Sequence, residues 1–287
     1  RRVVGIPITL VAVVFLLYAK FGNLIPGMLG HPGFSVQRIV SHMYLTTEGL
    51  FGMPLGVSAS FVFLFILFGA FLHSTGLGKF FIDLALAAAG RYVGGPAKVA
   101  VLASGFFGTI SGSSVANTVS TGTFTIPLMK SVGYRGAFAG AVEAASSTGG
   151  QIMPPIMGAA AFLMAEYMDL PYATVAVKAI LPAVLYFTGI FIAVHLEAKK
   201  LGLKGLSKDE MPKWADLGKK IYLLAPLVLL VWLVSSGAKT MQFSAAVSIL
   251  AAVIVGFLNK DERLTFKKIF EALEAGAKGA ITVAVAC

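Results

Sequence analysis

The sequence has 287 residues, of which 57% are hydrophobic and 13% are charged, and it carries a formal net charge of +10. Because an ordinary soluble domain has about 25% charged residues, this composition indicates an integral membrane protein. The basic residues lie in short segments between apolar stretches, where membrane topology accounts for them, so we expect no nucleic-acid partner. The single cysteine, Cys287, excludes an internal disulfide and a cysteine-based metal site in these residues.

Six apolar segments approach or exceed the roughly 20 helical residues that cross the hydrocarbon layer of a bilayer. In chain order they are residues 3–19, 54–73, 134–167, 172–195, 221–236 and 243–258. Residues 36–50 and 264–277 mix charged and apolar residues at helical spacing, which suits helices at the membrane interface, helices that brace a neighbour, or short loop helices. The pattern predicts an all-α polytopic membrane protein.

The distribution of lysine and arginine predicts how the segments are oriented. Residues 197–220 contain seven lysines and residues 260–278 are similarly basic, whereas the loop between the two intervening spans has only Lys239. Cytoplasmic loops of membrane proteins carry an excess of basic residues. We therefore place both basic segments in the cytoplasm.

Residues 97–129 are constrained by this orientation. Lys79, Arg91 and Lys98 place the start of the segment on the cytoplasmic side, and Lys130 places its end on the same side. The segment is long enough for two helices of about 15 residues, but not for two full spans. We therefore predict a re-entrant helical hairpin with the sequence SGSS at its tip, where irregular backbone must be buried in protein or face a water-filled cavity.

The motif SSTGGQIMPP interrupts the third apolar segment. Pro154 and Pro155 have no backbone N–H, so the carbonyls of Gly150 and Gln151 lose their usual helical donors. The two glycines before this point add backbone freedom. We predict a discontinuous span, with a half-helix to about Ser147, an unwound stretch to Gln151 and then a second half-helix.

A hairpin tip and an unwound helix at similar depth are the arrangement by which secondary transporters bind ions and substrate. Oxygen atoms replace the hydration of Na⁺, a hard cation that prefers oxygen ligands, and half-helix N-termini favour anionic groups. The candidate ligands at the two breaks are Ser111, Gly112, Ser113, Ser114, Asn117, Ser147, Thr148, Gly149, Gly150 and Gln151, with Ser146 beside them. The alternative for each small residue is ordinary packing and hydrogen bonding between membrane helices.

Glu143 lies in the middle of its span, four residues before Ser147 and on the same helical face. An acid within a membrane segment is a candidate functional group. It is a candidate carrier of a coupling proton in place of Na⁺; the alternatives are an ion pair with Arg135 or a structural group satisfied by hydrogen bonds. The sequence contains no nucleophile-elbow, phosphate-loop or paired His/Glu signature, so we expect neither an enzyme nor a cofactor.

At SGSSVANT, followed by GGQIMPPIMGAAAF, the chain resembles the large membrane subunit of the TRAP transporters, the tripartite ATP-independent periplasmic transporters. The stretch HPGFSVQRIVSHMYLTTEGLFGMPLGVSASFVFLFILFGAFL is similar to the branch in which the small and large membrane subunits are fused and which works with TAXI-type binding proteins. The resemblance covers essentially the whole chain.

This resemblance implies a multi-pass permease in the inner (cytoplasmic) membrane of a bacterium or archaeon. A periplasmic solute-binding protein would deliver a small organic acid such as a dicarboxylate, and an inward Na⁺ gradient would drive symport by an elevator motion of a transport domain. Residues 111–117 would form the tip of the inward-opening hairpin and residues 147–151 the broken helix, which together enclose a first sodium site. The alternative functions are a carboxylate or ion symporter without a binding protein, and a channel.

The resemblance also implies three regions. These are scaffold-type helices and an interfacial arm in residues 1–90, a transport-domain half in 91–170 with its hairpin at about 97–129 and broken helix at about 134–168, and scaffold helices in 171–287 with the basic loop 197–220 and an arm helix at about 262–278. The second, inverted half of the family pattern does not follow, and a fused small subunit would precede Arg1. We therefore expect a fragment, the N-terminal half of an inverted repeat, that cannot transport alone.

Overall fold

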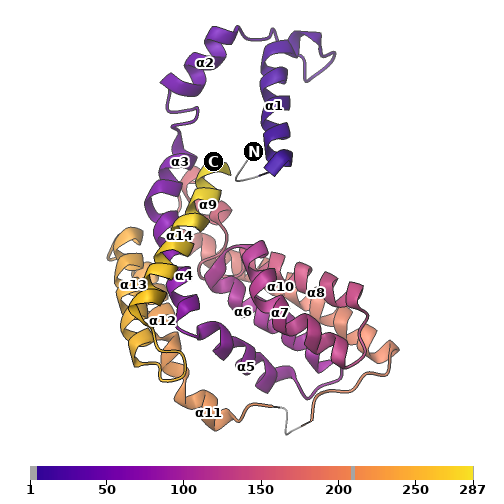
Figure 1. Cartoon of the computed structure of the whole chain (residues 1–287). Coiled ribbons are helices and arrows are strands. Elements are labelled where there is room, and N and C mark those ends of the chain that lie inside the picture. Colours follow the sequence, from indigo (N-terminus) through magenta and orange to yellow (C-terminus); the bar gives the residue numbers. More distant parts are fainter. Residues whose placement is uncertain (1–4, 208–210, 287) are drawn as a thin grey trace. The chain divides into compact units, whose positions relative to one another are not determined.

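The computed structural model describes residues 5–207 and 211–286, and every regular element in these ranges is helical (Figure 1). The predicted all-helical class is therefore confirmed. The chain divides into two compact units, one made of Arg1–Phe63 with Ala277–Cys287 and the other of Leu64–Gly276. All the candidate site residues lie in the second unit.

The first unit begins with a long apolar helix and continues through shorter helical segments. Its elements are α1 (Gly5–Phe21), η1 (Gly22–Leu24), α2 (Val36–Leu45), α3 (Met53–Val57), η2 (Ser58–Val62) and the end of α14 (Phe266–Ala286). The Ser35 hydroxyl accepts a hydrogen bond from the N–H of Arg38 at 3.1 Å, which satisfies a free donor in the first turn of α2. The helix predicted at 36–50 is confirmed, although it ends at Leu45.

Among the described residues, four helices are long and apolar enough to cross a membrane: Gly5–Leu24, Met53–Ser74, Tyr172–Lys200 and Met241–Leu258. A shorter apolar helix covers Ile221–Ser236. The elements of the second unit that form them are α4 (Phe63–Ser74), α10 (Tyr172–Lys200), η5 (Ile221–Leu224), α12 (Ala225–Ser236) and α13 (Met241–Leu258). The four long helices and the shorter one coincide with five of the six predicted apolar segments. The apolar surfaces of Gly5–Leu24, Tyr172–Lys200 and Met241–Leu258 are largely exposed, which suits a lipid environment, whereas half of Met53–Ser74 is buried in the protein.

The predicted hairpin is formed by α6 (Gly95–Ser111) and α7 (Ser114–Ser131), which pack against each other and against α8 (Gly136–Gly149) (Figure 1). Gly112 makes the turn with φ of +59°, a left-handed conformation that favours glycine. At 17 and 18 residues the two arms are about 26 and 27 Å long, slightly less than the roughly 30 Å of a bilayer core. The hairpin itself is confirmed, while its depth in a membrane stays a prediction.

The third apolar segment is discontinuous, as predicted, but the interruption begins later and extends further than expected. α8 continues to Gly149, a short helical turn η3 covers Gly150–Ile152, and α9 (Ala159–Tyr167) starts only after Gly158. The first half ends two residues beyond the predicted end at about Ser147, and the expected end of the unwound stretch at Gln151 is wrong, since α9 starts only at Ala159.

Hydrogen bonding explains the shift of this break. The missing proline donors affect only the carbonyls of residues 150 and 151, so the prolines do not require the helix to end as early as Ser147. The Gly150 carbonyl instead accepts from the N–H of Met153 at 3.2 Å, and the Gln151 carbonyl accepts from the N–H of Gly158 at 2.7 Å. The Tyr172 hydroxyl holds the far side of the loop, since it lies within hydrogen-bonding distance of the carbonyls of Pro155, at 2.9 Å, and Ile156 and donates to one of them at a time.

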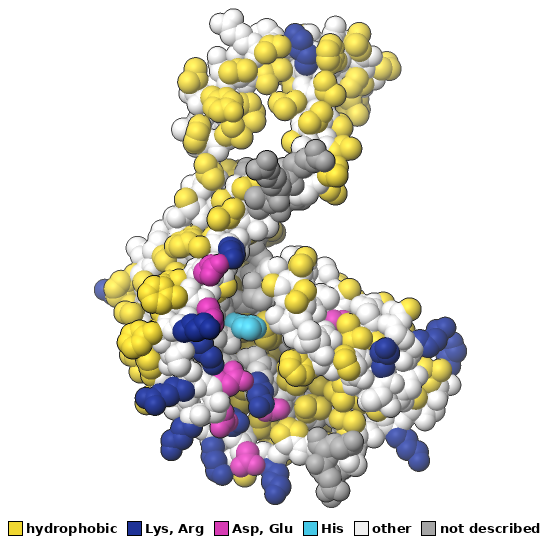
Figure 2. All heavy atoms as spheres, viewed as in Figure 1, with side chains coloured by type: hydrophobic (Ala, Val, Ile, Leu, Met, Phe, Trp, Pro, Cys, Tyr) yellow, Lys and Arg dark blue, Asp and Glu magenta, His cyan; other side chains and the backbone are white. Residues whose placement is uncertain are grey.

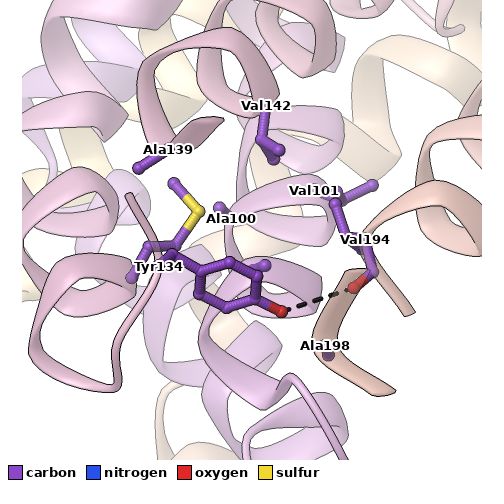
Figure 3. Packing of buried hydrophobic residues seen from close by; sticks show 9 residues of the cluster. Ala100, Val101, Tyr134, Ala139, Val142, Val194 and Ala198 are labelled. Carbon is purple, nitrogen blue, oxygen red and sulfur yellow. Dashed lines mark hydrogen bonds between the residues drawn. The ribbon is translucent and has the colours of Figure 1, made fainter. Parts of the chain in front are cut away.

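An apolar cluster fixes the base of the hairpin to α8 and α10 (Figure 3). Its buried members are Ala97, Ala100, Val101, Met129, Tyr134, Ala139, Val142, Val194 and Ala198. The Tyr134 hydroxyl donates to the Val194 carbonyl at 3.4 Å, so its polar atom is paired inside the cluster. The small alanine side chains let these helices approach closely, as in other membrane helix interfaces.

Two short helices of the second unit were not predicted, α5 (Leu77–Ala89) and α11 (Trp214–Lys219). α5 packs Ala85 and Ala89 against Val99 of α6. It escaped prediction because it is too short to span a bilayer and contains charged residues.

Polar side chains connect the residues after α13 to Thr75, which follows α4, and to Lys220, which precedes η5. The Asn259 side chain donates to the Thr75 carbonyl at 2.8 Å. Lys220 forms an ion pair with Asp261, and the hydrogen bond from Lys220 lowers the pKa of Asp261 below its usual value. Basic and acidic side chains gather around α11 on the face shown in Figure 2. The assignment of this end to the cytoplasm stays a prediction.

Gly108→Ala tests the close approach between the hairpin and the break. A Cβ on Gly108 would lie 2.2 Å from Gly150 Cα, so we expect the substitution to destabilise the permease by about 1–3 kcal/mol. The matched control is Gly140→Ala on α8, where a Cβ would have nothing within 4 Å. Thermal unfolding of both purified variants measures the difference, and equal melting temperatures would contradict the packing described here.

Candidate functional site

Glu143 is the centre of a buried polar cluster between the hairpin and the first half of the broken helix. Its side chain is fully buried. Both carboxylate oxygens accept hydrogen bonds from hydroxyls. The donors, which together with Glu143 we call the Glu143 cluster, are Ser104 of α6, Thr121 and Thr125 of α7, and Ser147 of α8. The Ser104 and Ser147 distances to Oε1 are 2.8 and 3.0 Å. One carboxylate therefore joins three helices.

The cluster supplies hydrogen bonds to this carboxylate rather than an opposite charge. Within the described residues, no Lys, Arg or His nitrogen lies within 4.0 Å of Glu143. Arg135, which we considered as a partner, instead lies 3.9 Å from Glu197. The ion pair with Arg135 is therefore wrong; Arg135 stands at the start of α8, about two turns from Glu143. Hydrogen-bond donors offset the cost of burying the carboxylate in place of a countercharge.

Asn117 is fully buried beside the Glu143 cluster. Its Nδ2 donates to the Ser104 carbonyl at 2.8 Å. Because a carbonyl can only accept, this bond fixes which end of the amide is nitrogen. Its Oδ1 lies 3.3 Å from the Thr121 hydroxyl. A Cβ on Gly150 would lie 3.1 Å from Asn117 Nδ2, so the absence of a side chain at Gly150 brings the amide against the break.

Several predicted residues of the two breaks meet in the structure. Gln151 Nε2 lies 3.5 Å from Ser114 Oγ at the start of α7. The turn at Gly112 lies against residues 157 and 158, since a Cβ there would be 2.4 Å from the Met157 carbonyl oxygen. The Ser111 hydroxyl oxygen is buried and has no hydrogen-bond partner among the described residues. Hairpin tip and helix break are thus neighbours, with oxygen atoms on both sides.

Other predicted residues have different contacts. The Ser113 hydroxyl caps α7 by accepting from the N–H of Ala116 at 3.3 Å. Thr148 is exposed and donates to the Ala144 carbonyl of its own helix at 2.8 Å. A Cβ on Gly149 would meet the Tyr186 ring at 2.4 Å, which places its Cα against α10. Thr148 and Gly149 therefore face away from the contact between tip and break, and the Ser113 hydroxyl is engaged in capping α7.

Ser146 and Ser147 are neighbours with different surroundings. Both are fully buried. The Ser147 hydroxyl donates to Glu143, as described above. The Ser146 hydroxyl oxygen has no hydrogen-bond partner among the described residues.

Sequence reasoning missed Ser104, Thr121 and Thr125 as partners of the buried acid. A signal for two of them was present, because Asn117, Thr121 and Thr125 recur every four residues and so share one face of α7. Ser104 could not be found in this way, since it lies on the other arm of the hairpin. Among the described residues, no group of three or more His, Cys, Asp or Glu side chains could hold a metal ion.

The whole chain, residues 1–287, matches the family model described as "Tripartite ATP-independent periplasmic transporter, DctM component". It is 28% identical over 203 residues to a C4-dicarboxylate TRAP transporter large permease protein of Pseudomonas aeruginosa, covering 70% of this chain and 47% of the relative. It is 26% identical over 215 residues to the 2,3-diketo-L-gulonate TRAP transporter large permease protein of Escherichia coli, covering 75% and 50%.

A third relative is the sialic acid TRAP transporter permease protein of Haemophilus influenzae, which is 27% identical over 209 residues, covering 72% of this chain and 33% of the relative. The chain therefore spans half or less of the length of these three relatives.

Thr121→Val tests the contribution of the Glu143 cluster to stability. The substitution removes a donor to a buried carboxylate, so we expect a loss of about 1–3 kcal/mol in the free energy of unfolding. The control is Thr123→Val on the exposed side of the same helix, where the hydroxyl contacts only its own backbone. Thermal unfolding of the two variants checks this, and equal stability would mean that the cluster contributes little.

Proposed function

Because the chain belongs to the family of the DctM component of tripartite ATP-independent periplasmic transporters, we propose that it is part of a permease that imports a small organic acid by secondary active transport. The names of three relatives support this substrate class, since C4-dicarboxylates, 2,3-diketo-L-gulonate and sialic acid are all carboxylic acids. The apolar helices support a multi-pass protein in the membrane.

Sodium is the proposed coupling ion, and the observation that carries this proposal is the contact between hairpin tip and helix break. The turn at Gly112, next to Ser111, approaches the Met157 carbonyl oxygen of the break, and Asn117 lies beside the break with its Nδ2 towards Gly150. In the described part of the chain the buried Ser111 hydroxyl has no hydrogen-bond partner, and a carbonyl such as that of Gly150 keeps a second lone pair after accepting one hydrogen bond. Such neutral oxygens suit a monovalent hard cation.

The remaining parts of the proposal concern the whole permease. This chain spans half or less of the length of its three relatives. A TAXI-type binding protein would deliver the substrate on the periplasmic side, and a small membrane subunit fused upstream would complete the scaffold. An inverted second half with its own hairpin would supply the other half of the substrate site. The hairpin and broken helix would move together as part of an elevator, which their shared packing favours.

Uptake by the full-length permease with its binding protein in proteoliposomes tests the coupling ion. We expect an imposed Na⁺ gradient to drive uptake, and Asn117→Ala to raise the Na⁺ concentration for half-maximal rate about tenfold, because the buried amide beside the break is lost. The control is Thr123→Ala on the exposed side of α7. Uptake driven only by a pH gradient, and abolished by Glu143→Gln rather than by Asn117→Ala, would replace sodium by a proton carried on Glu143.

A further inference from the structure

Lys98 is a largely buried cation at the base of the hairpin. It lies in the first turn of α6, and only 6% of its surface is exposed. Its Nζ lies 5.1 Å from the centre of the Phe191 ring of α10 and 5.9 Å from the centre of the Tyr92 ring, in the turn before α6. In the described part of the chain, no carboxylate oxygen lies within 4.0 Å of this nitrogen. The ammonium group is therefore held against aromatic rings without an anion.

The two rings do not replace an anionic partner. The attraction of a cation to an aromatic face is modest compared with the cost of removing an ion from water. An ammonium group also carries three N–H donors that an oxygen acceptor satisfies best. The fully enclosed polar atoms without a partner, among the residues described, belong to Ser111, Ser146 and His195. Lys98 Nζ is not one of them, so it still reaches the surface, where an anion can approach it.

The charges around Lys98 are mostly positive. Lys199, near the end of α10, is close enough for its charge to act on that of Lys98. Glu197 is the acidic side chain at this end of α10, and it already lies 3.9 Å from Arg135 and 4.0 Å from Lys200. The two lysines therefore share a region of positive charge that this part of the protein does not neutralise.

The position of this region along α10 matches the depth of lipid headgroups. α10 has 29 residues, so at 1.5 Å per residue it is about 44 Å long, close to the thickness of a bilayer with its headgroup layers. When α10 crosses a bilayer, its last turns lie among the headgroups. A Cβ on Gly94 would lie 2.5 Å from the Cβ of Ala198, one of the residues in Figure 3. The start of α6, with Lys98, therefore lies at the same level.

We propose that Lys98 and Lys199 form a binding site for the phosphate group of an anionic lipid headgroup. Phosphate oxygens would accept charge-assisted hydrogen bonds from the two ammonium groups, and basic pockets between membrane helices suit such headgroups. A lipid bound there would connect the base of the hairpin to α10. The site lies about 20 Å along α6 from Ser111 at the hairpin tip, so it does not depend on the proposed ion coupling.

The experiment measures thermal unfolding of the full-length permease, stripped of lipid in an uncharged detergent, as dioleoylphosphatidylglycerol or dioleoylphosphatidylcholine is added. We expect the anionic lipid to raise the melting temperature at a lower mole fraction than the zwitterionic one. Lys98→Met keeps an apolar side chain against the rings but removes the charge and the donors, so the half-saturating fraction of phosphatidylglycerol should rise about tenfold. The matched control is Lys178→Met, which removes the same charge from an exposed residue near the start of α10 and should leave this value unchanged.

Three results would overturn the proposal. An unchanged half-saturating fraction in Lys98→Met would mean that the rings alone hold the ammonium group. An equal increase in Lys178→Met would mean that the lipid responds to net charge rather than to a site. Stabilisation by inorganic phosphate at matched ionic strength, equal to that by phosphatidylglycerol and lost in Lys98→Met, would assign the site to a soluble phosphate instead of a lipid. If Lys98→Met fails to fold, Lys98→Gln makes the same comparison.

Discussion

Burial of the Glu143 carboxylate is the constraint on which the arrangement of the second unit depends. A polar group buried in apolar surroundings is costly unless it is hydrogen-bonded, and here the donors come from both arms of the hairpin as well as from α8. None of these helices can move away from the others without leaving the carboxylate short of partners. The hairpin and the first half of the broken helix are therefore held as one body by a polar group at its centre.

Two glycines, which have no side chain, allow the close approach beside this polar cluster. Gly108 and Gly150 face each other so closely that a Cβ on either would meet the backbone of the other. Small residues of this kind let membrane helices approach, and the close approach lets the buried Asn117 amide lie against the break. The glycine contact therefore brings α6 against the start of the break, beside the polar cluster.

The break itself combines prolines with replacement hydrogen bonds. Pro154 and Pro155 end the helix, but the carbonyls they release accept from Met153 and Gly158. Tyr172 of α10 then holds the far side of the loop. The result is an ordered interruption whose carbonyls each retain one lone pair, which is what a cation site in an irregular segment requires.

The sequence alone determined the class of protein, the apolar helices, the hairpin and the existence of the break, because these follow from local composition, helix length and proline chemistry. The family was also visible in the two break motifs. The limits of the break could not be predicted from the sequence, because the carbonyls of Gly150 and Gln151 accept hydrogen bonds from residues three and seven positions further along the chain.

Only the tertiary structure decided which side chains surround Glu143. Ser104 lies 39 residues away from it in the sequence, and no periodic pattern connects the two. The tertiary structure also shows which candidate ligands lie near one another: Thr148 and Gly149 lie away from the tip, whereas Asn117 lies at the break. The physical reason is that a local pattern fixes the face of a helix on which a residue lies, whereas packing between helices decides which faces meet.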